Sequence, residues 1–284
     1  MPDLLAEVAA ARERGDLVPG WLERGIRSGI AGEPLLLSAS GVDGVKGTWS
    51  EMVEKWTFND GSQMVRKVTQ ERSEADAEVL ASIVGISLGA DVPRVYRADD
   101  RVVYTEFKEG QHRSSLAPEE VPLRPELTRS GMRISLLDVL ITNTDRHAMN
   151  WLLSPDPKLV TPTGQKIGII GIDHGLSFEH PKYWVPKGDF GTQFVTENPS
   201  GSDTKYTWKP NPLSPEDVQG VRKVLQNPRM KWEFERRGRI DWYNNMLSQL
   251  HMIERNAVGT TPRMPMPAPE IPRVITRPER SPLD

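Results

Sequence analysis

The chain has 284 residues, of which 37% are hydrophobic and 26% charged, which suits one large or two small globular domains with a sizeable core. The net charge of −3 gives no basic field that would attract nucleic acid, and no apolar run approaches the roughly 20 residues of a membrane span. The sequence contains no cysteine, which excludes disulfides and thiolate metal sites and is compatible with a reducing, cytoplasmic location.

The first 30 residues are predicted to form a helical appendage. Apolar side chains recur at helical spacing over residues 4–11, Gly15 ends that helix, and Trp21 and Ile26 indicate a second short one. The segment either packs on its neighbour or binds a partner as an arm, and packing is favoured. It lacks a basic region followed by an apolar stretch, so we expect no signal peptide.

Residues 34–68 are rich in strand signals, and a loop at residues 41–47 carries three glycines, among them Gly44 and Gly47. A glycine loop beside a sheet lets backbone N–H groups approach phosphate oxygens closely, although glycines also simply make turns. The loop is therefore a candidate phosphate-binding segment with an ordinary turn as the alternative.

Strand alternation assigns the faces of the strand that ends at Val68. Val65 and Lys67 point to one side, whereas Met64, Arg66 and Val68 point to the other. Kinases carry a phosphate-contacting lysine on a strand that follows the glycine loop, and Lys67 stands at that place. Arg66 then faces away from the site, and the alternative is that Lys67 is a solvated strand residue.

A helix is predicted over residues 72–88, because apolar side chains recur there at steps of three to four residues. Glu74 and Glu78 are four residues apart and share one face of this helix. A strand over residues 102–107 follows.

Three polar residues at the ends of apolar elements carry the strongest functional signal. A long helix over residues 125–141 leads to Asp145 and Asn150, and a strand over residues 167–172 ends on Asp173. In kinase-type phosphoryl transfer a loop aspartate orients or deprotonates the acceptor hydroxyl, and an asparagine five residues later and a second aspartate hold magnesium. Each residue alone could be a turn former, but the ordered pair of motifs favours the catalytic interpretation.

Residues 181–212 combine six aromatic side chains with many Gly, Pro, Ser and Asp residues and show no clear periodicity. They could form an acceptor-recognition surface, or a surface loop that buries a few aromatics in the core. The aromatic residues are Tyr183, Trp184, Phe190, Phe194, Tyr206 and Trp208.

The remaining chain is predicted to be helical up to a proline-rich tail. Ser214 caps one helix, the last helix covers residues 239–254, and the basic cluster between them is read as a solvated face. Residues 259–284 carry seven prolines, cannot bury a core, and could dock a partner.

The pattern Asn-x-Asp-Arg-His-x-x-Asn at residues 143–150, followed by Ile-Asp-His-Gly-x-Ser-Phe at residues 172–178, resembles the catalytic core of the phosphatidylinositol 3- and 4-kinase-like group. That group includes HipA-like bacterial protein kinases and actinobacterial kinase-like proteins. The resemblance is strong over residues 134–178, weaker over residues 36–111, and absent from the first 30 or so residues, the segment after Phe178 and the tail.

The resemblance implies a two-lobed α+β fold of the protein-kinase type, with a small β-rich lobe and a mostly helical one. It also implies that a helix glutamate pairs with Lys67, where family spacing favours Glu74 and Glu78 is the alternative. The hinge between the lobes, whose backbone bonds the adenine edge, would lie at Glu106 and Phe107. The implied domains are 1–30 (appendage), 31–110 (β-rich lobe), 111–258 (helical lobe) and 259–284 (tail).

We therefore expect an ATP- and Mg²⁺-dependent kinase that transfers the γ-phosphoryl group to a hydroxyl. A protein Ser/Thr hydroxyl is the first choice of acceptor, on the resemblance to HipA-like kinases, and a lipid or small-molecule hydroxyl is the second. A kinase-like scaffold without activity is the non-enzymatic alternative.

Overall fold

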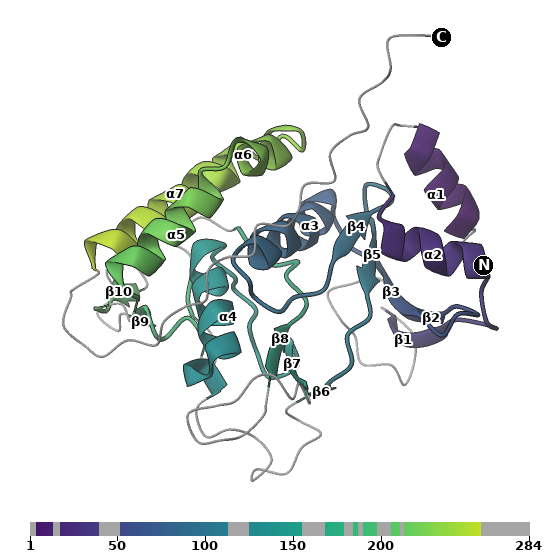
Figure 1. The fold of residues 1–284 in the computed structure, drawn as a ribbon, viewed down its shortest axis with the longest axis horizontal. Helices are drawn as coiled ribbons and strands as arrows, with labels where there is room; N and C mark the ends of the chain where they lie inside the picture. Colours follow the sequence, from purple (N-terminus) through teal and green to yellow (C-terminus); the bar gives the residue numbers. More distant parts are fainter. Residues whose placement is uncertain are drawn as a thin grey trace.

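The computed structural model describes residues 4–13, 18–39, 52–112, 125–154, 168–178, 184–186, 190–197, 206–210 and 213–256. They form a lobe built on a β-sheet and a mostly helical lobe, joined through the segment that follows β5 (Figure 1). The predicted two-lobed, kinase-like α+β fold is confirmed. Gly44, Gly47 and the proline-rich tail lie outside the described residues, so the predictions made for them stay predictions.

The first lobe, here called the N-lobe, contains a five-stranded antiparallel sheet in the order β1-β2-β3-β5-β4. Its register places Lys67 between Val53 and Val103, and Arg66 between Glu54 and Tyr104. The two residues therefore point to opposite faces, as alternation predicts. The strands are β1 (Leu35–Ala39), β2 (Met52–Thr57), β3 (Gln63–Val68), β4 (Val95–Arg97) and β5 (Val102–Glu106).

The helices α1 (Leu4–Glu13) and α2 (Gly20–Ser28) belong to the N-lobe core (Figure 1). They bury apolar side chains in one cluster with residues of the sheet, namely Leu4, Val8, Leu22, Trp56, Phe58, Met64, Tyr96, Ala98 and Tyr104. The favoured interpretation, packing instead of a free arm, is confirmed. A polar contact adds to it, because Glu7 accepts hydrogen bonds from Arg66, at 2.8 Å, and from the Tyr104 hydroxyl.

The helix α3 (Arg72–Ser87) covers the other face of the sheet and also reaches the second lobe. Ala75 and Val79 pack against Val103 of β5. Leu80 and Val84 belong to the core of the second lobe. Because opposite sides of α3 face different lobes, ten consecutive or nearly consecutive residues of the helix are buried, from Ala75 to Gly85.

The second lobe, here called the C-lobe, holds the sequence motifs of residues 143–150 and 172–178 within a helical frame. Its three-stranded sheet has the order β6-β7-β8, and a two-stranded sheet pairs β9 with β10. The elements are β6 (Gln111–His112), η3 (Pro125–Leu127), α4 (Arg129–Leu140), β7 (Trp151–Ser154), β8 (Gly168–Gly171), β9 (Val195–Glu197), β10 (Tyr206–Trp208), α5 (Pro215–Leu225), α6 (Pro228–Glu235) and α7 (Ile240–Arg255).

Local sequence signals explain where two of these helices begin. The helix predicted over residues 125–141 is divided, because Thr128 leaves the helical conformation and its hydroxyl accepts a hydrogen bond from Gly131 N, at 3.0 Å, as the cap of α4. Ser214 caps the start of α5, as predicted, and the structure adds that it forms a capping box with Asp217. Among the described residues, no helix is both long and apolar enough to cross a membrane.

The aromatics of residues 181–212 do not form an exposed gripping surface where the structure describes them. Trp184, Phe190, Phe194 and Tyr206 are buried in the C-lobe core. Trp184 also donates its indole N–H to the backbone oxygen of Asn143, at 2.7 Å, just before the predicted catalytic loop, residues 145–150. The hypothesis of an aromatic acceptor-binding surface is wrong for these four side chains, because they are packed in the core.

The contact between α1 and the sheet generates a first prediction. Among the described residues, replacing Glu7 by alanine leaves the buried guanidinium of Arg66 with Glu54, at 3.5 Å, as its one ion-pair partner, so the free energy of unfolding should fall by about 1–3 kcal/mol. Glu23→Ala is the matched control, because Glu23 pairs with the exposed Arg12 and Arg27, and it should cost less than about 1 kcal/mol. Urea unfolding measures both, and equal losses would mean that α1 is only loosely attached.

Candidate active site

Lys67 of β3 joins the two lobes at the centre of the candidate site. Its Nζ lies 2.5 Å from Oε1 of Glu78 on α3 and 2.6 Å from Oδ1 of Asp173 in the C-lobe. The Glu78 carboxylate also accepts a hydrogen bond from the backbone N–H of His174, at 3.0 Å. One buried carboxylate therefore holds both the lysine and the segment that carries Asp173.

The charges of this cluster stabilise one another. Burial alone would lower the pKa of the Lys67 amine, but the carboxylates of Asp173 and Glu78 outweigh burial and raise it, so the amine is charged. Burial raises the pKa of Glu78. Burial opposes ionisation of Asp173 as well, yet the ammonium of Lys67 lowers its pKa to about 2. The Asp173 side chain is 46% exposed, so it is the open end of the cluster.

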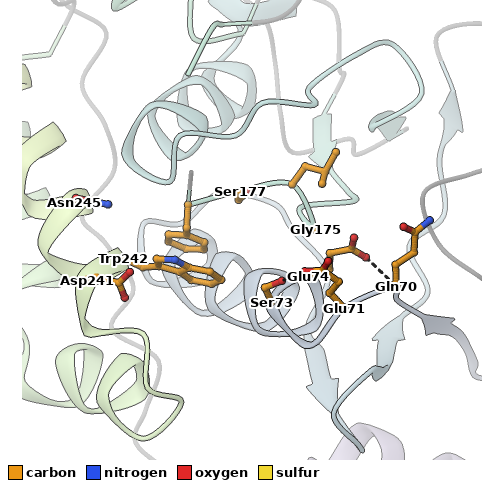
Figure 2. A pocket seen from close by; sticks show the side chains of 11 residues that line it. Gln70, Glu71, Ser73, Glu74, Gly175, Ser177, Asp241, Trp242 and Asn245 are labelled. Atoms are coloured by element: carbon orange, nitrogen blue, oxygen red, sulfur yellow. Dashed lines mark hydrogen bonds between the residues drawn. The ribbon is translucent and has the colours of Figure 1, made fainter. Parts of the chain in front are cut away.

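The prediction that Lys67 pairs with Glu74 is wrong, because the partner is Glu78. Glu74 lies one turn earlier on α3, and its carboxylate accepts a hydrogen bond from the backbone N–H of Gln70, at 3.0 Å (Figure 2). Both glutamates share a helix face, but only the Glu78 position is buried deeply enough to meet Lys67 and His174. Glu74 instead lines a neighbouring cavity.

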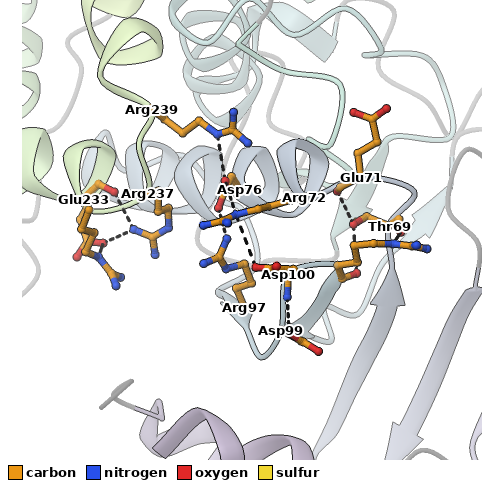
Figure 3. A network of polar contacts seen from close by, with 12 residues as sticks. Thr69, Glu71, Arg72, Asp76, Arg97, Asp99, Asp100, Glu233, Arg237 and Arg239 are labelled. Carbon is orange, nitrogen blue, oxygen red and sulfur yellow. Dashed lines mark hydrogen bonds and ion pairs between the residues drawn. The ribbon is translucent and has the colours of Figure 1, made fainter. Parts of the chain in front are cut away.

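A buried carboxylate on the opposite side of α3 fixes the helix to both lobes. Asp76 is fully buried and binds Arg97 of β4, at 2.6 Å, and Arg239 at the start of α7, at 3.0 Å (Figure 3). The charge-assisted bonds hold α3 from the N-lobe and the C-lobe together. They thereby position Glu78, two residues further along the helix.

Asp145 and Asn150 lie at the two ends of the catalytic loop and contact each other. The Asn150 side-chain amide donates to the Asp145 backbone oxygen, at 2.6 Å, and to the carboxylate oxygen Oδ2, at 3.0 Å. The side-chain oxygen of Asn143 accepts from the backbone N–H of Asp145, at 2.8 Å, which fixes the start of the loop. Asn150 is buried, and its side-chain oxygen is the group left for a metal.

Arg146 organises the loop from inside, a role that the sequence analysis missed. Its guanidinium is 1% exposed and binds Asp138 of α4, at 3.0 Å, while Nη1 donates to the backbone oxygens of Asn150 and of Ile172, the latter at 2.7 Å. The Arg146 side chain thus connects α4 to Asn150, which is itself a predicted metal ligand, and to Ile172, which precedes the other predicted ligand, Asp173. Nothing in the spacing of the motif distinguishes a buried arginine from an exposed one.

Backbone bonds place Asp173 beside the loop. The N–H of Ile172 donates to the Asn150 oxygen, at 3.1 Å, so Asn150 and Asp173 emerge from adjacent strand ends. Asp173 has a positive φ of 54°, a conformation that aspartate tolerates better than most residues and that often occurs at functional sites. Thr144 then binds the Leu176 oxygen through its N–H, at 3.1 Å, and through its hydroxyl, at 2.8 Å.

The donor set fits magnesium better than a transition metal. Asp173 and Asn150 offer carboxylate and amide oxygens, and no group of three His, Cys, Asp or Glu side chains that could hold a metal exists in the part of the chain that the structure describes. Mg²⁺ is commonly held by one or two protein oxygens together with phosphate oxygens and water. The residues therefore fit a metal that arrives with a nucleotide.

The predicted hinge residues Glu106 and Phe107 lie where β5 leaves the sheet. Their backbone N–H groups already donate within the N-lobe, Glu106 to the oxygen of Arg94 at 2.9 Å and Phe107 to that of Gln63 at 3.3 Å. A nucleotide base would have to use their carbonyl oxygens or the backbone beyond them. The Nζ of Lys55 lies 4.1 Å from the centre of the Phe107 ring, a cation near the hinge that the sequence did not reveal.

Comparisons with known proteins agree with the kinase interpretation. Residues 94–189 match the family model described as phosphatidylinositol 3- and 4-kinase, which is less than half of the chain. No curated protein matches the chain by sequence. This segment contains both catalytic motifs, and its similarity supports a phosphotransferase, whereas placement in the HipA-like branch stays a prediction.

Solved kinase structures resemble the fold at low identity. The Rio2 kinase of Chaetomium thermophilum, in a complex described as ADP/Mg²⁺-phosphoaspartate, is 12% identical, with a TM-score of 0.42 over 82% of this chain and 74% of that one. The proinflammatory kinase CtkA of Helicobacter pylori is 13% identical, with a TM-score of 0.41 over 78% of this chain and 96% of that one. Neither similarity assigns an acceptor to this chain.

The buried ion pair of the loop generates a second prediction. Arg146→Met leaves the Asp138 carboxylate buried and unpaired, so the free energy of unfolding should fall by about 3–5 kcal/mol. Arg146→Met combined with Asp138→Leu should lose less than the sum of the single losses, because no charge is then stranded. Lys231→Met is the control, since Lys231 forms an exposed pair with Glu235. Additive losses in denaturant titrations would show that Arg146 and Asp138 do not depend on each other.

Proposed function

We propose that the chain is an ATP- and Mg²⁺-dependent kinase that transfers the γ-phosphoryl group to a hydroxyl, in the first place to that of a protein Ser or Thr. The observation that carries the proposal is the Lys67 cluster, in which one charged amine contacts Glu78 and Asp173 across the two lobes. A kinase needs these groups together to hold phosphates and metal. A scaffold could use the same cluster to join its lobes, but it would not need Asp145 and Asn150 beside it.

In this proposal Lys67 contacts the nucleotide phosphates and Glu78 keeps the ammonium in place. The raised pKa of the Lys67 amine ensures its charge at physiological pH. Gly175 lies directly beside this pair, because a Cβ on that residue would be in van der Waals contact with Lys67 Nζ, at 3.6 Å, and with Glu78 Oε1, at 3.7 Å.

Asp145 orients the acceptor hydroxyl and takes its proton. Asn150 donates its side-chain amide to Oδ2 of Asp145, at 3.0 Å, and thereby orients this carboxylate. Asn150 and Asp173 would hold Mg²⁺, which when bound neutralises charge on the phosphates. Asp173 must then share its carboxylate between Lys67 and the metal, and its exposure permits that change.

Two variants of Lys67 test the proposal. Lys67→Met removes the amine and should reduce phosphoryl transfer by at least about a hundredfold. Lys67→Arg retains the positive charge for Glu78 and Asp173, and therefore the fold, but not the compact ammonium geometry, so it should reduce transfer with little change in melting temperature. Asp173→Asn removes a proposed Mg²⁺ ligand and should abolish Mg²⁺-dependent transfer. Lys231→Met, on the exposed side of α6, should leave transfer unchanged.

The measurement is the transfer of labelled phosphate from ATP, with and without Mg²⁺, to a protein mixture, to phosphatidylinositol vesicles and to small alcohols. Labelled serine or threonine in protein supports the proposal. Label in lipid or in small molecules alone would show that the acceptor is a lipid or a small molecule and not a protein. Wild-type protein that binds no nucleotide and labels nothing would identify the chain as a kinase-like scaffold.

A further inference from the structure

A cavity of about 510 Å³ opens beside the Lys67 cluster, between the start of α3, the segment after Asp173 and the start of α7 (Figure 2). Its wall includes Gly175 and Leu176, directly behind the predicted metal ligand. The ring of Trp242 forms another wall and is fixed there, because Phe178 stacks on one face, with ring centres 5.1 Å apart, and Arg239 lies over the ring at 4.6 Å. The size falls in the range of sites that hold a ligand or a ligand's side chain.

The described lining of the cavity is acidic. Glu71, just before α3, and Asp241 of α7 are exposed at its rim, and Glu74 of α3 lies half-buried further in. Within that described lining there is no lysine, arginine or histidine. The nearby arginines are already engaged, Arg239 by Asp76 at 3.0 Å and Arg72 by Asp100 at 3.6 Å. The field in the cavity therefore favours a cation.

Two groups deeper in the cavity, the Glu74 carboxylate and the Ser177 hydroxyl, would be stabilised by a bound ligand. Burial raises the pKa of Glu74, and the attraction of Lys67 does not outweigh that effect, so a cation in the cavity would relieve the cost of its charge. Ser177 is 6% exposed, and its hydroxyl has no hydrogen-bond partner among the described residues although the residue lines the cavity. Buried hydroxyls are normally hydrogen-bonded, so this one indicates a donor or acceptor brought by a ligand.

The carboxylates do not converge on a metal ion. Across the described ranges no three acidic or histidine side chains are arranged to hold one. The acidic groups instead come from the start of α3 and its N-cap on one side of the opening and from the start of α7 on the other. This spacing suits an organic cation with several donors, such as a guanidinium or ammonium group on a flexible stem.

The cavity is joined to the reaction centre by its own wall. The Leu176 oxygen accepts both hydrogen bonds of Thr144, the residue before Asp145, and Gly175 lies against Lys67 and Glu78. A ligand bound there would contact a wall that is bonded to Thr144, next to Asp145, the residue proposed to orient the acceptor hydroxyl. A phosphoinositide headgroup, which is anionic, would be repelled by the same surface.

We propose that this cavity binds an arginine or lysine side chain of a protein acceptor and so selects serine or threonine residues with basic neighbours. The proposal rests on the proposed kinase function for its consequence, but the binding site can be tested without catalysis.

The experiment measures binding by fluorescence anisotropy with no nucleotide present. The probes are an eight-residue peptide with two arginines near a single serine and its twin with glutamines in place of the arginines. The arginine peptide should bind at least about tenfold more tightly, and its affinity should fall as salt is raised. Glu71→Gln combined with Asp241→Asn should weaken it about tenfold, whereas Glu235→Gln, on the exposed side of α6, should not.

Equal binding of the two peptides, or an unchanged affinity in the double variant, would overturn the proposal. Agmatine, a small guanidine, is the competing arm, and if it binds as tightly as the peptide the ligand is a small cation and the protein assignment is wrong. Phosphoryl transfer to the two peptides is measured separately. Selective binding without any transfer would contradict the kinase proposal and leave the cation site intact.

Discussion

The catalytic loop depends on the buried contact between Arg146 and Asp138. A buried guanidinium is costly unless its donors are satisfied, and here a carboxylate and the backbone oxygens of Asn150 and Ile172 satisfy them. Those oxygens belong to the strand ends that carry Asn150 and Asp173. The contacts that compensate the buried charge of Arg146 therefore also fix the positions of Asn150 and Asp173, which are proposed to act on the nucleotide.

The helix α3 has a corresponding role between the lobes. Asp76 fixes it to Arg97 and Arg239, and Glu78, on another face, holds Lys67 and the backbone of His174. The helix cannot rotate without breaking contacts in both lobes. The proposed active state thus requires a position of α3 in which the contacts of Asp76 and those of Glu78 form at the same time. A ligand in the cavity at the start of α3 would affect that position.

Much of the fold followed from periodic patterns, because strand alternation and helix spacing depend on neighbours in sequence. The opposite faces of Arg66 and Lys67 are one example, and the cap at Ser214 is another. The choice between Glu74 and Glu78 could not follow in the same way. Both lie on one helix face, and only the packing of α3 against the C-lobe determines which of them is buried beside Lys67.

Residues that act through burial were the hardest to predict. Arg146 is chemically identical to a surface arginine, and only the fold around it shows that it is 1% exposed. The aromatics from Trp184 to Tyr206 lack a helical or strand period, so nothing local indicated that they enter the C-lobe core. In both cases some of the contacts span the sequence, because Arg146 binds Ile172, 26 residues later, and Trp184 binds Asn143, 41 residues earlier.

The attachment of α1 to the sheet has a consequence for observing the molecule in motion. Since Leu4, Val8 and Glu7 are fixed to the N-lobe, the helix must travel with that lobe as one rigid body. Leu5 is 59% exposed on the outer side of the same helix. A pair of spectroscopic labels, one at Leu5 and one on an exposed residue of α6, would therefore report the distance between the two lobes and not local motion of the N-terminal helix.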